Sequence, residues 1–268
     1  MTRRQLLAIV PAACARAQTD NLRRGRDIVD LVLQALGGPK FLAMEDRTEA
    51  GRMYSFYREE LRGLSKATLY TRYLTPSAGA SEGKVYARER QSFYRDAKKE
   101  DYAILFDEQN GWSITFRGAA PLAPDVVTRY QDTTLRNVFY ILRQRLKEPG
   151  MIIEFSGSEV IDNTPVDRVT FTDSDNTSVA ADFHKSTHLP VRQVFYRRDP
   201  VTRERRQELT RFDKYRDVGG GVMWPYNVQR DRDGERVFQL YSEHVSINNS
   251  LTDELFTLPL DMKVIPRK

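Results

Sequence analysis

The sequence predicts a mainly β protein with some α-helix (α+β), built as one strongly curved antiparallel sheet covered by two helices. Three observations predict this class. Most of the chain after residue 46 alternates apolar and polar residues with period two, as half-buried strands do. Turns rich in Gly, Asn and Asp join these segments at short intervals, which favours an antiparallel meander over a parallel sheet. Two longer segments instead place apolar residues at helical spacing.

The N-terminal segment has the pattern of an export signal. Arg3 and Arg4 precede a short apolar run, and small residues stand one and three positions before a cut at Gln18. The two arginines also resemble those of a twin-arginine signal. We therefore expect residues 1–17 to be an export signal peptide, used by the Sec or the twin-arginine route, and residues 18–268 to form a single periplasmic domain. An amphipathic N-terminal helix is the alternative, which a proline in the middle of the run disfavours.

Cys14, the only cysteine, allows a second interpretation of the same segment, as an outer-membrane lipoprotein acylated at Cys14. Cleavage before Gln18 is favoured and leaves no thiol for a disulfide or a metal site. Three arginines and no acid leave with the signal, so the remaining 39 basic and 37 acidic residues give a formal charge of +2. Such a chain gives no reason to expect nucleic acid as a partner. We also expect no transmembrane span in the mature chain, because no later stretch is long and apolar enough.

Two helices are predicted. The first covers residues 20–36, where Asp20 or Asn21 can cap the start and Gly-Gly-Pro follows the end. Its apolar stripe consists of Ile28, Val29, Val32, Leu33 and Leu36. The second covers residues 132–150, interrupts the β pattern and is stopped by Pro-Gly. Its continuous apolar face consists of Leu135, Val138, Phe139, Leu142 and Leu146.

The remaining segments are predicted strands. Before the second helix they lie near residues 47–57, 66–74, 84–94, 101–106 and 112–116, with a loop at 75–83 and a hairpin signal at Asn110-Gly111. After it they lie near residues 151–160, 167–172, 178–183 and 189–196, in a long charged pair around 203–216, and at 222–230 and 235–247.

Candidates for catalysis or metal binding are few, and we expect neither an enzyme nor a cofactor. His184 and His188, with Asp182 as a third ligand, have a spacing that suits a metal only on a helix. The surrounding pattern is strand, turn, strand, so turn-flanking histidines are favoured. Asp173 and Asp175 have a calcium-like spacing but lack the glycine and distal glutamate of a calcium loop, and a β-turn is favoured there too.

The most basic run lies at residues 197–207, RRDPVTRERRQ. Arg203, Arg205 and Arg206 are candidates for a partner-binding surface. The interrupting acids favour a solvated hairpin instead, whose charges protect a strand edge from aggregation.

Aromatic and aliphatic residues occupy alternate positions of many strands. Each alone is explained by an ordinary core, but a curved sheet with only two covering helices leaves room for an apolar cavity. The candidate cavity residues are Tyr70, Phe106, Trp112, Phe116, Leu135, Phe139, Leu142, Phe155, Phe171, Phe183, Phe195, Trp224, Tyr226 and Tyr241.

The order of these elements resembles the periplasmic lipoprotein-carrier superfamily of the LolA/LolB type, which includes outer-membrane lipoprotein-sorting proteins and the sensor-binding RseB group. An export signal is followed by the helix IVDLVLQALGG, long antiparallel strands, and a helical insertion after the hairpin at residues 110–112. A second meander carries GSEVIDNTPVDRVTF, LPVRQVFY and DKYRDVGGGVMWPYNVQ. The ending LTDELFTLP, with Asp253 to Pro259, is similar to the usual terminus of the superfamily.

The resemblance implies an incomplete β-barrel whose cavity shields acyl chains beneath a helical lid. Leu135, Phe139 and Leu142 are the candidates for the inner face of that lid, and Arg47 and Arg52 for its anchoring arginine. The implied function is a periplasmic carrier or binding protein for lipidated or other apolar ligands, in outer-membrane lipoprotein sorting and without catalysis. An envelope protein-interaction or sensing module on the same fold is the alternative.

Overall fold

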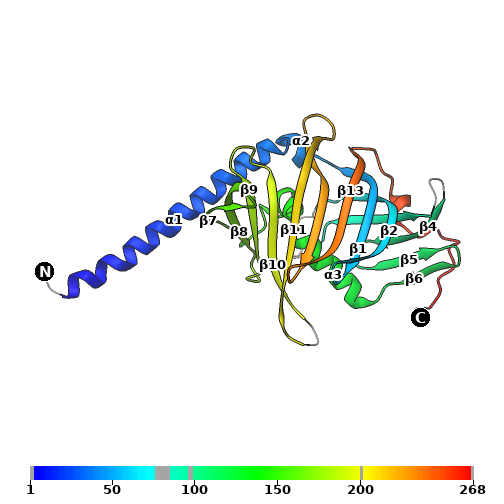
Figure 1. Ribbon diagram of the computed structural model, residues 1–268, viewed down its shortest axis with the longest axis horizontal. Coiled ribbons are helices and arrows are strands. Elements are labelled where there is room, and N and C mark those ends of the chain that lie inside the picture. The colour runs from blue at the N-terminus through cyan, green and yellow to red at the C-terminus, as the bar shows by residue number, and fades with distance from the viewer. Residues whose placement is uncertain (1–2, 76–84, 96–98, 200–201, 267–268) are drawn as a thin grey trace.

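A computed structural model describes residues 3–75, 85–95, 99–199 and 202–266, and its dominant feature is one large antiparallel sheet. The described residues form 13 strands in the order β6-β5-β4-β3-β2-β1-β13-β12-β11-β10-β9-β8-β7. Strands that follow one another in sequence therefore lie side by side, except that β6 and β7 stand at opposite edges, and the first and last strands, β1 and β13, pair with each other. The sheet curls strongly without closing (Figure 1), so the predicted mainly β class and the incomplete barrel are confirmed.

The strands follow the predicted period-two segments closely. The first group is β1 (Asp46–Tyr57), β2 (Glu60–Tyr73), β3 (Ala87–Tyr94), β4 (Glu100–Phe106), β5 (Gly111–Thr115) and β6 (Gly118–Pro121). The second group is β7 (Ile152–Ile161), β8 (Thr164–Thr172), β9 (Ser178–His184), β10 (Pro190–Arg198), β11 (Arg205–Asp217), β12 (Met223–Arg232) and β13 (Glu235–Ile247). Strand β6 was not predicted, and the charged pair expected around residues 203–216 is the single long strand β11.

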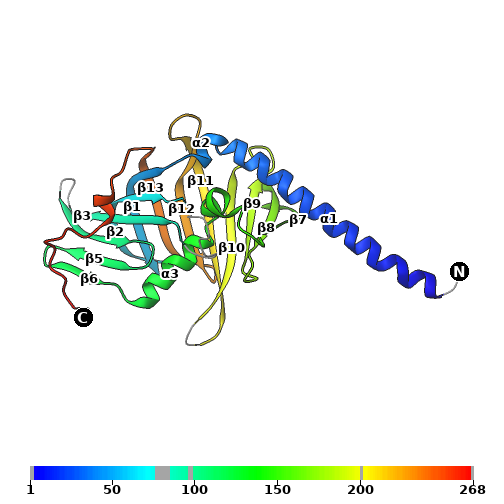
Figure 2. The ribbon, with the colours of Figure 1, turned by 180° about the vertical axis from the view of Figure 1, so that it is seen from behind.

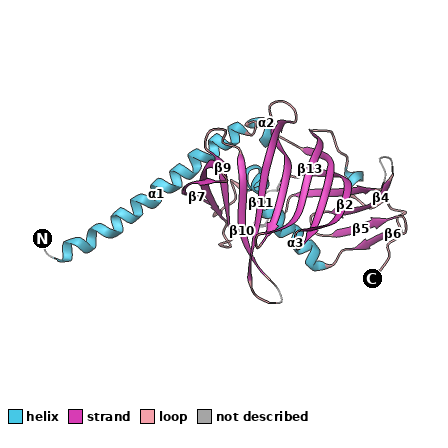
Figure 3. Ribbon diagram, in the orientation of Figure 1, coloured by secondary structure: helices cyan, strands magenta, loops and turns pink. Residues whose placement is uncertain are grey.

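Helix α1 (Arg3–Ala35) is longer than predicted. It begins at Arg3, so the expected cap at Asp20 or Asn21 is wrong; the intervening Ala, Arg and Gln residues favour helix and do not interrupt it. Figure 3 shows its N-terminal half projecting away from the sheet. Its C-terminal half packs on β7 so closely that a Cβ at Gly25 would lie 2.8 Å from the carbonyl oxygen of Ile153.

The apolar stripe of α1 is confirmed. Ile28, Val29, Val32 and Leu36 are buried, and Leu33 packs at the edge of the same core. The helix ends as predicted, because Gly37 and Gly38 have positive φ and the Gly38 N–H donates to Leu33 O at 2.8 Å. The short helix α2 (Pro39–Leu42) then leads into β1. No helix in the described ranges is long and apolar enough to span a membrane.

The second predicted helix is broken into two pieces. Helix α3 (Pro124–Leu135) starts earlier than expected, and α4 (Val138–Tyr140) continues into a π-helical turn, η1 (Ile141–Arg145). The break has a clear cause at Asn137, whose Oδ1 accepts from the Phe139 N–H at 2.9 Å and starts a new helix. From β10, Gln193 Oε1 accepts from the Val138 N–H at 2.7 Å, and its Nε2 donates to Arg136 O at 3.1 Å.

The chain ends on the outer side of the first strand group. The 3-10 turn η2 (Asp253–Phe256) places Phe256 in a small core with Leu105 and Ile114. Asp253 accepts hydrogen bonds from Arg72 at 2.9 Å and from Arg88 at 2.8 Å. The last described residues pair with the edge of β6 through Ala119, which covers that edge of the sheet.

Candidate functional site

A cavity of about 360 Å³ lies between the concave face of the sheet and helix α3. Figure 2 shows α3 crossing that face. Strands β1–β4 and β11–β13 supply the wall, and α3 and α4 supply the cover. The wall follows from period-two alternation, because every second residue of a strand points to the same face. On β2, for example, Leu69, Thr71 and Tyr73 line the cavity, and the intervening residues do not.

One side of the cavity is apolar. Its wall there includes Met53, Leu69, Ile104, Phe238 and Leu240. At one end stands an aromatic partition that separates the cavity from the main core. Phe139 forms it with Trp224, at 4.7 Å between ring centroids, and with Phe212 in an edge-on contact at 5.1 Å.

Helix α3 covers the cavity with few contacts. Tyr130 stacks on Phe106 of β4, with ring centroids 3.8 Å apart. Arg197 of β10 donates to Thr133 Oγ1 at 3.0 Å and lies 3.7 Å from Asp132. None of residues 124–135, all of which the structure describes, is buried. The cover is therefore a mixed polar and apolar helix that rests on the sheet.

The following α4–η1 segment is held much more firmly. Tyr140 Oη accepts from the Tyr86 N–H at 2.7 Å, and Gln144 Nε2 donates to Leu74 O at 3.0 Å. Arg143 donates to Met44 O and stacks on the Tyr73 ring at 4.3 Å, where burial lowers the pKa of its guanidinium. These bonds fix α4–η1 to β1, β2 and the start of β3.

Charged side chains line the cavity beside the apolar wall. Arg47 of β1 is 8% exposed and donates to Tyr73 Oη and Thr71 Oγ1, both at 3.1 Å. Its Nε lies 3.4 Å from Glu49, and its guanidinium stacks 4.1 Å above the ring of Trp224. Arg47 is therefore built into the wall by polar and stacking contacts on every side.

Two further strands place charges in the same space. Glu89 of β3 accepts from Gln91 Nε2 at 2.5 Å, and burial raises its pKa although Arg47 and Arg230 act in the opposite direction. Arg230 of β12 has its pKa lowered by burial. Burial also raises the pKa of Tyr130 on α3, with Glu89 adding to the effect. The strand alternation could have located these charges, because Glu49, Glu89 and Arg230 fall on inward positions of their strands.

The structure brings three of the predicted cavity residues to this space: Phe106, Phe139 and Trp224 line it. Most of the others lie in the solid core under β7–β12, namely Leu142, Phe155, Phe171, Phe183, Phe195 and Tyr226. Tyr70 and Trp112 pack on the small core at the other face, and Leu135 packs beside Tyr140. Phe116 is 89% exposed, and Tyr241 is 36% exposed on the convex face.

The two predicted anchoring arginines lie on opposite faces of β1. Arg47 lines the cavity, but its hydrogen bonds go to the sheet and not to α3. Arg52 is exposed on the convex side and bonds Glu243 at 2.7 Å. The firm attachment of a helical segment to β1 and β2 is made instead by Arg143, which the sequence did not single out.

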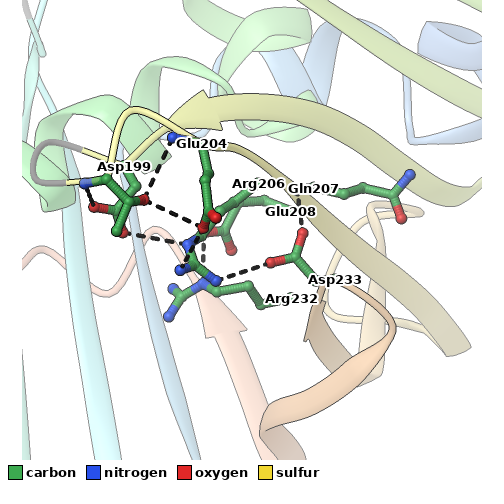
Figure 4. A network of polar contacts seen from close by, with 8 residues as sticks. Asp199, Glu204, Arg206, Gln207, Glu208, Arg232 and Asp233 are labelled. Atoms are coloured by element: carbon green, nitrogen blue, oxygen red, sulfur yellow. Dashed lines mark hydrogen bonds and ion pairs between the residues drawn. The ribbon is translucent and has the colours of Figure 1, made fainter.

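The predicted partner surface lies on the β10–β11 hairpin, which is central in the sheet and not at an edge. Figure 4 shows Arg206 between Asp199, Glu204 and Asp233. Its guanidinium bonds Asp199 at 3.2 Å, Asp233 at 3.2 Å and Glu204 at 3.4 Å. Arg205 stacks on Tyr196 at 3.7 Å, and Arg203 is exposed at the turn. The expectation that these charges protect a sheet edge from aggregation is therefore wrong, because β10 and β11 are both paired on either side.

The candidate metal residues have other partners. Asp182 is fully buried and bonds Arg168 at 2.7 Å and Arg192 at 2.5 Å. His184 Nδ1 accepts from the Ser186 N–H at 3.0 Å in the β9–β10 turn. Among the described residues no group of three His, Cys, Asp or Glu side chains is placed to hold a metal ion.

The calcium-like Asp173 also belongs to a turn. Its Oδ1 accepts from the Thr177 N–H at 2.8 Å, and its Oδ2 pairs with Arg145 at 3.1 Å. Oδ1 thus closes the β8–β9 turn, as the favoured interpretation predicts, and Oδ2 ties that turn to η1.

Comparison with solved structures identifies the architecture. A DUF1329 family protein from Desulfovibrio piger superposes with a TM-score of 0.58 at 12% identity, covering 88% of this chain and 97% of that one. A protein described as an outer membrane lipoprotein-sorting domain, from Vibrio parahaemolyticus, gives 0.57 at 11% identity, with coverage of 88% and 97%. A LolA superfamily protein from Nitrosomonas europaea gives 0.51 at 13% identity, with coverage of 87% and 97%.

The chain has a LolA-like fold. The resemblance predicted from the order of elements is confirmed at the level of the fold. No family model matches the sequence, and no curated protein gives a significant sequence match. The half-barrel and its covering helices are therefore what this LolA-like chain shares with those proteins.

Proposed function

We propose that this LolA-like protein is a periplasmic carrier or binding protein that holds the acyl chain of a lipidated or other apolar ligand in the cavity under α3. The observation that carries the proposal is the partly apolar cavity between α3 and the concave face of this fold. Exposing an acyl chain to water costs about 0.8 kcal/mol per CH₂ group. A carrier must therefore cover the chain, and a cavity between sheet and helix supports that role.

Helix α3 is the moving part in this proposal. It has no buried residue and rests on the sheet through Tyr130 and Thr133, whereas α4–η1 is bonded to the backbone next to the ends of β1, β2 and β3. The break at Arg136–Asn137 separates the two segments and supplies a hinge. We infer that α3 swings open to admit a ligand and that α4–η1 stays in place.

The proposed compartment follows from the export signal predicted for residues 1–17 and from the lipoprotein-sorting neighbours of the fold. In the periplasm a ligand must be loaded and released without ATP. A lid held by few contacts suits that requirement, because its opening costs little free energy. Outer-membrane lipoprotein sorting is the process we propose for it, with lipoprotein acyl chains as the cargo.

A binding experiment tests the proposal. We expect the protein purified from the periplasm to carry lipid in native mass spectrometry and, after delipidation, to take up a fluorescent fatty acyl probe. Ile104 lines the cavity, so Ile104→Trp fills it and should abolish uptake. Val160→Trp is the matched control, because Val160 is exposed on β7 and its replacement should leave uptake unchanged. No co-purified lipid together with no probe uptake by the wild-type protein would overturn the proposal.

A further inference from the structure

Arg230 occupies an unusual position in the cavity wall. Its guanidinium lines the cavity, 5.1 Å from the centroid of the Phe238 ring. Apart from its stacking on Phe238, it forms no hydrogen bond or ion pair with any residue that the structure describes. The side chain is half-buried, so it gives up part of its hydration without a carboxylate in return. The structure therefore leaves the hydrogen-bond donors of this guanidinium at the cavity without an acceptor from the described part of the protein.

Three other arginines in the described part of the chain are paired with carboxylates. Arg168 and Arg192 both bond the buried carboxylate of Asp182. Arg145 bonds Glu148 at 2.5 Å and Asp173 at 3.1 Å. Arg230 differs from these, and the difference coincides with its place at the cavity.

The carboxylates nearest to Arg230 in the cavity already have partners. Glu89 accepts from Gln91, and Glu49 accepts from Ser242 Oγ at 2.5 Å and lies 3.4 Å from Arg47. Both act on Arg230 electrostatically without forming an ion pair with it. The protein therefore satisfies its own acids elsewhere and leaves the guanidinium of Arg230 available.

A second arginine enters the same space from the cover. Arg129 of α3 is exposed and also lines the cavity, and its side chain forms no hydrogen bond or ion pair within the described part of the chain. One available cation thus stands on the wall and one on the helix above it. Counting Arg47, the cavity holds three cations against the two carboxylates Glu49 and Glu89, so an added anion would balance its charge.

We propose that the cavity binds a single-chain amphiphile with one anionic head group, a carboxylate or a phosphate monoester. Its head pairs with Arg230 and Arg129, and its chain lies along Met53, Leu69, Ile104 and Leu240. The proposal rests on the proposed carrier function and specifies its ligand. A guanidinium matches either head group through two parallel hydrogen bonds. The volume of about 360 Å³ is at the low end for small-molecule sites, which suits one chain and not several.

The test compares three probes of equal chain length on delipidated protein: palmitic acid, palmitoyl lysophosphatidic acid and hexadecanol. We expect the wild-type protein to bind at least one of the two anions roughly tenfold to a hundredfold more tightly than the alcohol, the usual range for a charge-assisted hydrogen bond. The preferred anion identifies the source of the head group as a fatty acid or a lipid phosphate.

Variants of Arg230 then assign the effect. Arg230→Met keeps the length of the side chain and should remove the preference for anions while leaving hexadecanol binding unchanged. Arg230→Lys should restore part of the preference, because an ammonium keeps the charge but not the paired geometry. Arg232→Met, two residues along β12, is the matched control; Arg232 bonds Glu208 at 2.9 Å outside the cavity, so this variant should keep the preference. Thermal unfolding should show all variants folded, since removing an unpaired enclosed charge does not destabilise.

The outcomes separate the two proposals. Equal binding of acid, phosphate and alcohol by the wild-type protein would overturn the anionic head group but leave the carrier function intact. An anion preference that survives in Arg230→Met would also overturn the assignment. Failure of all three probes to bind would overturn the carrier function itself, and this inference with it.

Discussion

The two ends of the sheet share one backbone pattern but differ in what covers their concave face. Strands β7–β12 lie under α1 and α4–η1, and their inward residues, including Phe171 and Phe183 at 1% exposure, form a solid core. Strands β1–β4 and β13, together with the part of β12 that carries Arg230, lie under α3, which buries none of its own residues. One end is filled and the other is hollow.

The charges follow the same division. In the filled half, Asp182 and its arginines stand on the face opposite Ala181 and Phe183, away from the apolar core. In the hollow half, Arg47, Glu89 and Arg230 stand on the inner face. The covering helix therefore decides whether the concave face is filled or hollow. The aliphatic stripe of α1 completes a solid core, whereas α3, with Arg, Tyr and Thr on its inner side, leaves a cavity with polar lining.

The largest effect is expected on the free energy of unfolding, when one phenylalanine from each half of the sheet is replaced by alanine. Phe183→Ala should lower the free energy of unfolding by about 3–5 kcal/mol, because it opens a void in a packed core. Phe238→Ala should cost only about 1 kcal/mol, since its ring already borders a cavity and loses fewer contacts. Urea unfolding followed by circular dichroism measures both. Equal losses would show that the second half is packed as tightly as the first.

A smaller loss of stability is expected where Gln193 of β10 holds the start of α4, between the filled and the hollow half. Gln193 is 2% exposed and satisfies the Val138 N–H, so Gln193→Leu should cost about 1–3 kcal/mol by leaving that buried donor without a partner. Gln239→Leu is the matched control, because its partners Asn227 and Tyr241 are accessible enough to bond water instead. Amide hydrogen exchange should become faster at the start of α4 in Gln193→Leu and not in Gln239→Leu. Exchange that stays slow in Gln193→Leu would mean that Asn137 alone holds the break.

The fold was predictable from the sequence because its signals are local. Period-two alternation gave nearly every strand, and the stripe from Ile28 to Leu36 gave the buried face of α1. Strand β6 was not predicted, because the four-residue segment Gly118–Pro121 is too short, and its side chains are too small, to show alternation. The single helix over 132–150 was wrong because a capping Asn within an apolar stripe is a weak signal, and Gln193, which accepts from the Val138 N–H at the start of the new helix, lies 55 residues beyond Val138.

The site was less predictable, because a cavity is a property of distant elements together. Aromatic residues at inward positions look alike in sequence whether they fill a core, as Phe171 does, or border a cavity, as Phe106 does. The more specific signal was charge at inward positions. Arg47, Glu89 and Arg230 break the apolar alternation of their strands, and of the three only Arg47 was singled out from the sequence, as a candidate for the anchor of the lid.

The smallest expected effect concerns pH and the hollow half alone. Burial raises the pKa of Glu89 above its ordinary value of 4.5, and the negative charge of Glu49 adds to the rise. The positive charges of Arg47 on β1 and Arg230 on β12 lower the pKa of Glu89 but do not cancel the rise. Tyr130 faces Glu89 from α3. The folded protein therefore binds this proton more tightly than the unfolded chain. Stability from this group is fully present below pH 4.5 and is lost as the pH rises through the raised pKa.

Glu89→Gln should remove that fall in stability, because the amide does not ionise. Urea unfolding measured from pH 4 upward gives the comparison, and Glu243→Gln on the exposed convex face should keep the wild-type profile. If the stability of Glu89→Gln changed with pH as that of the wild type does, ionisation of Glu89 would carry no cost. Water or Arg230 would then fully stabilise the ionised carboxylate, and the cavity would be no less polar than the surface. The expected difference would instead show that the hollow half holds the ionised carboxylate of Glu89 at a measurable cost in stability.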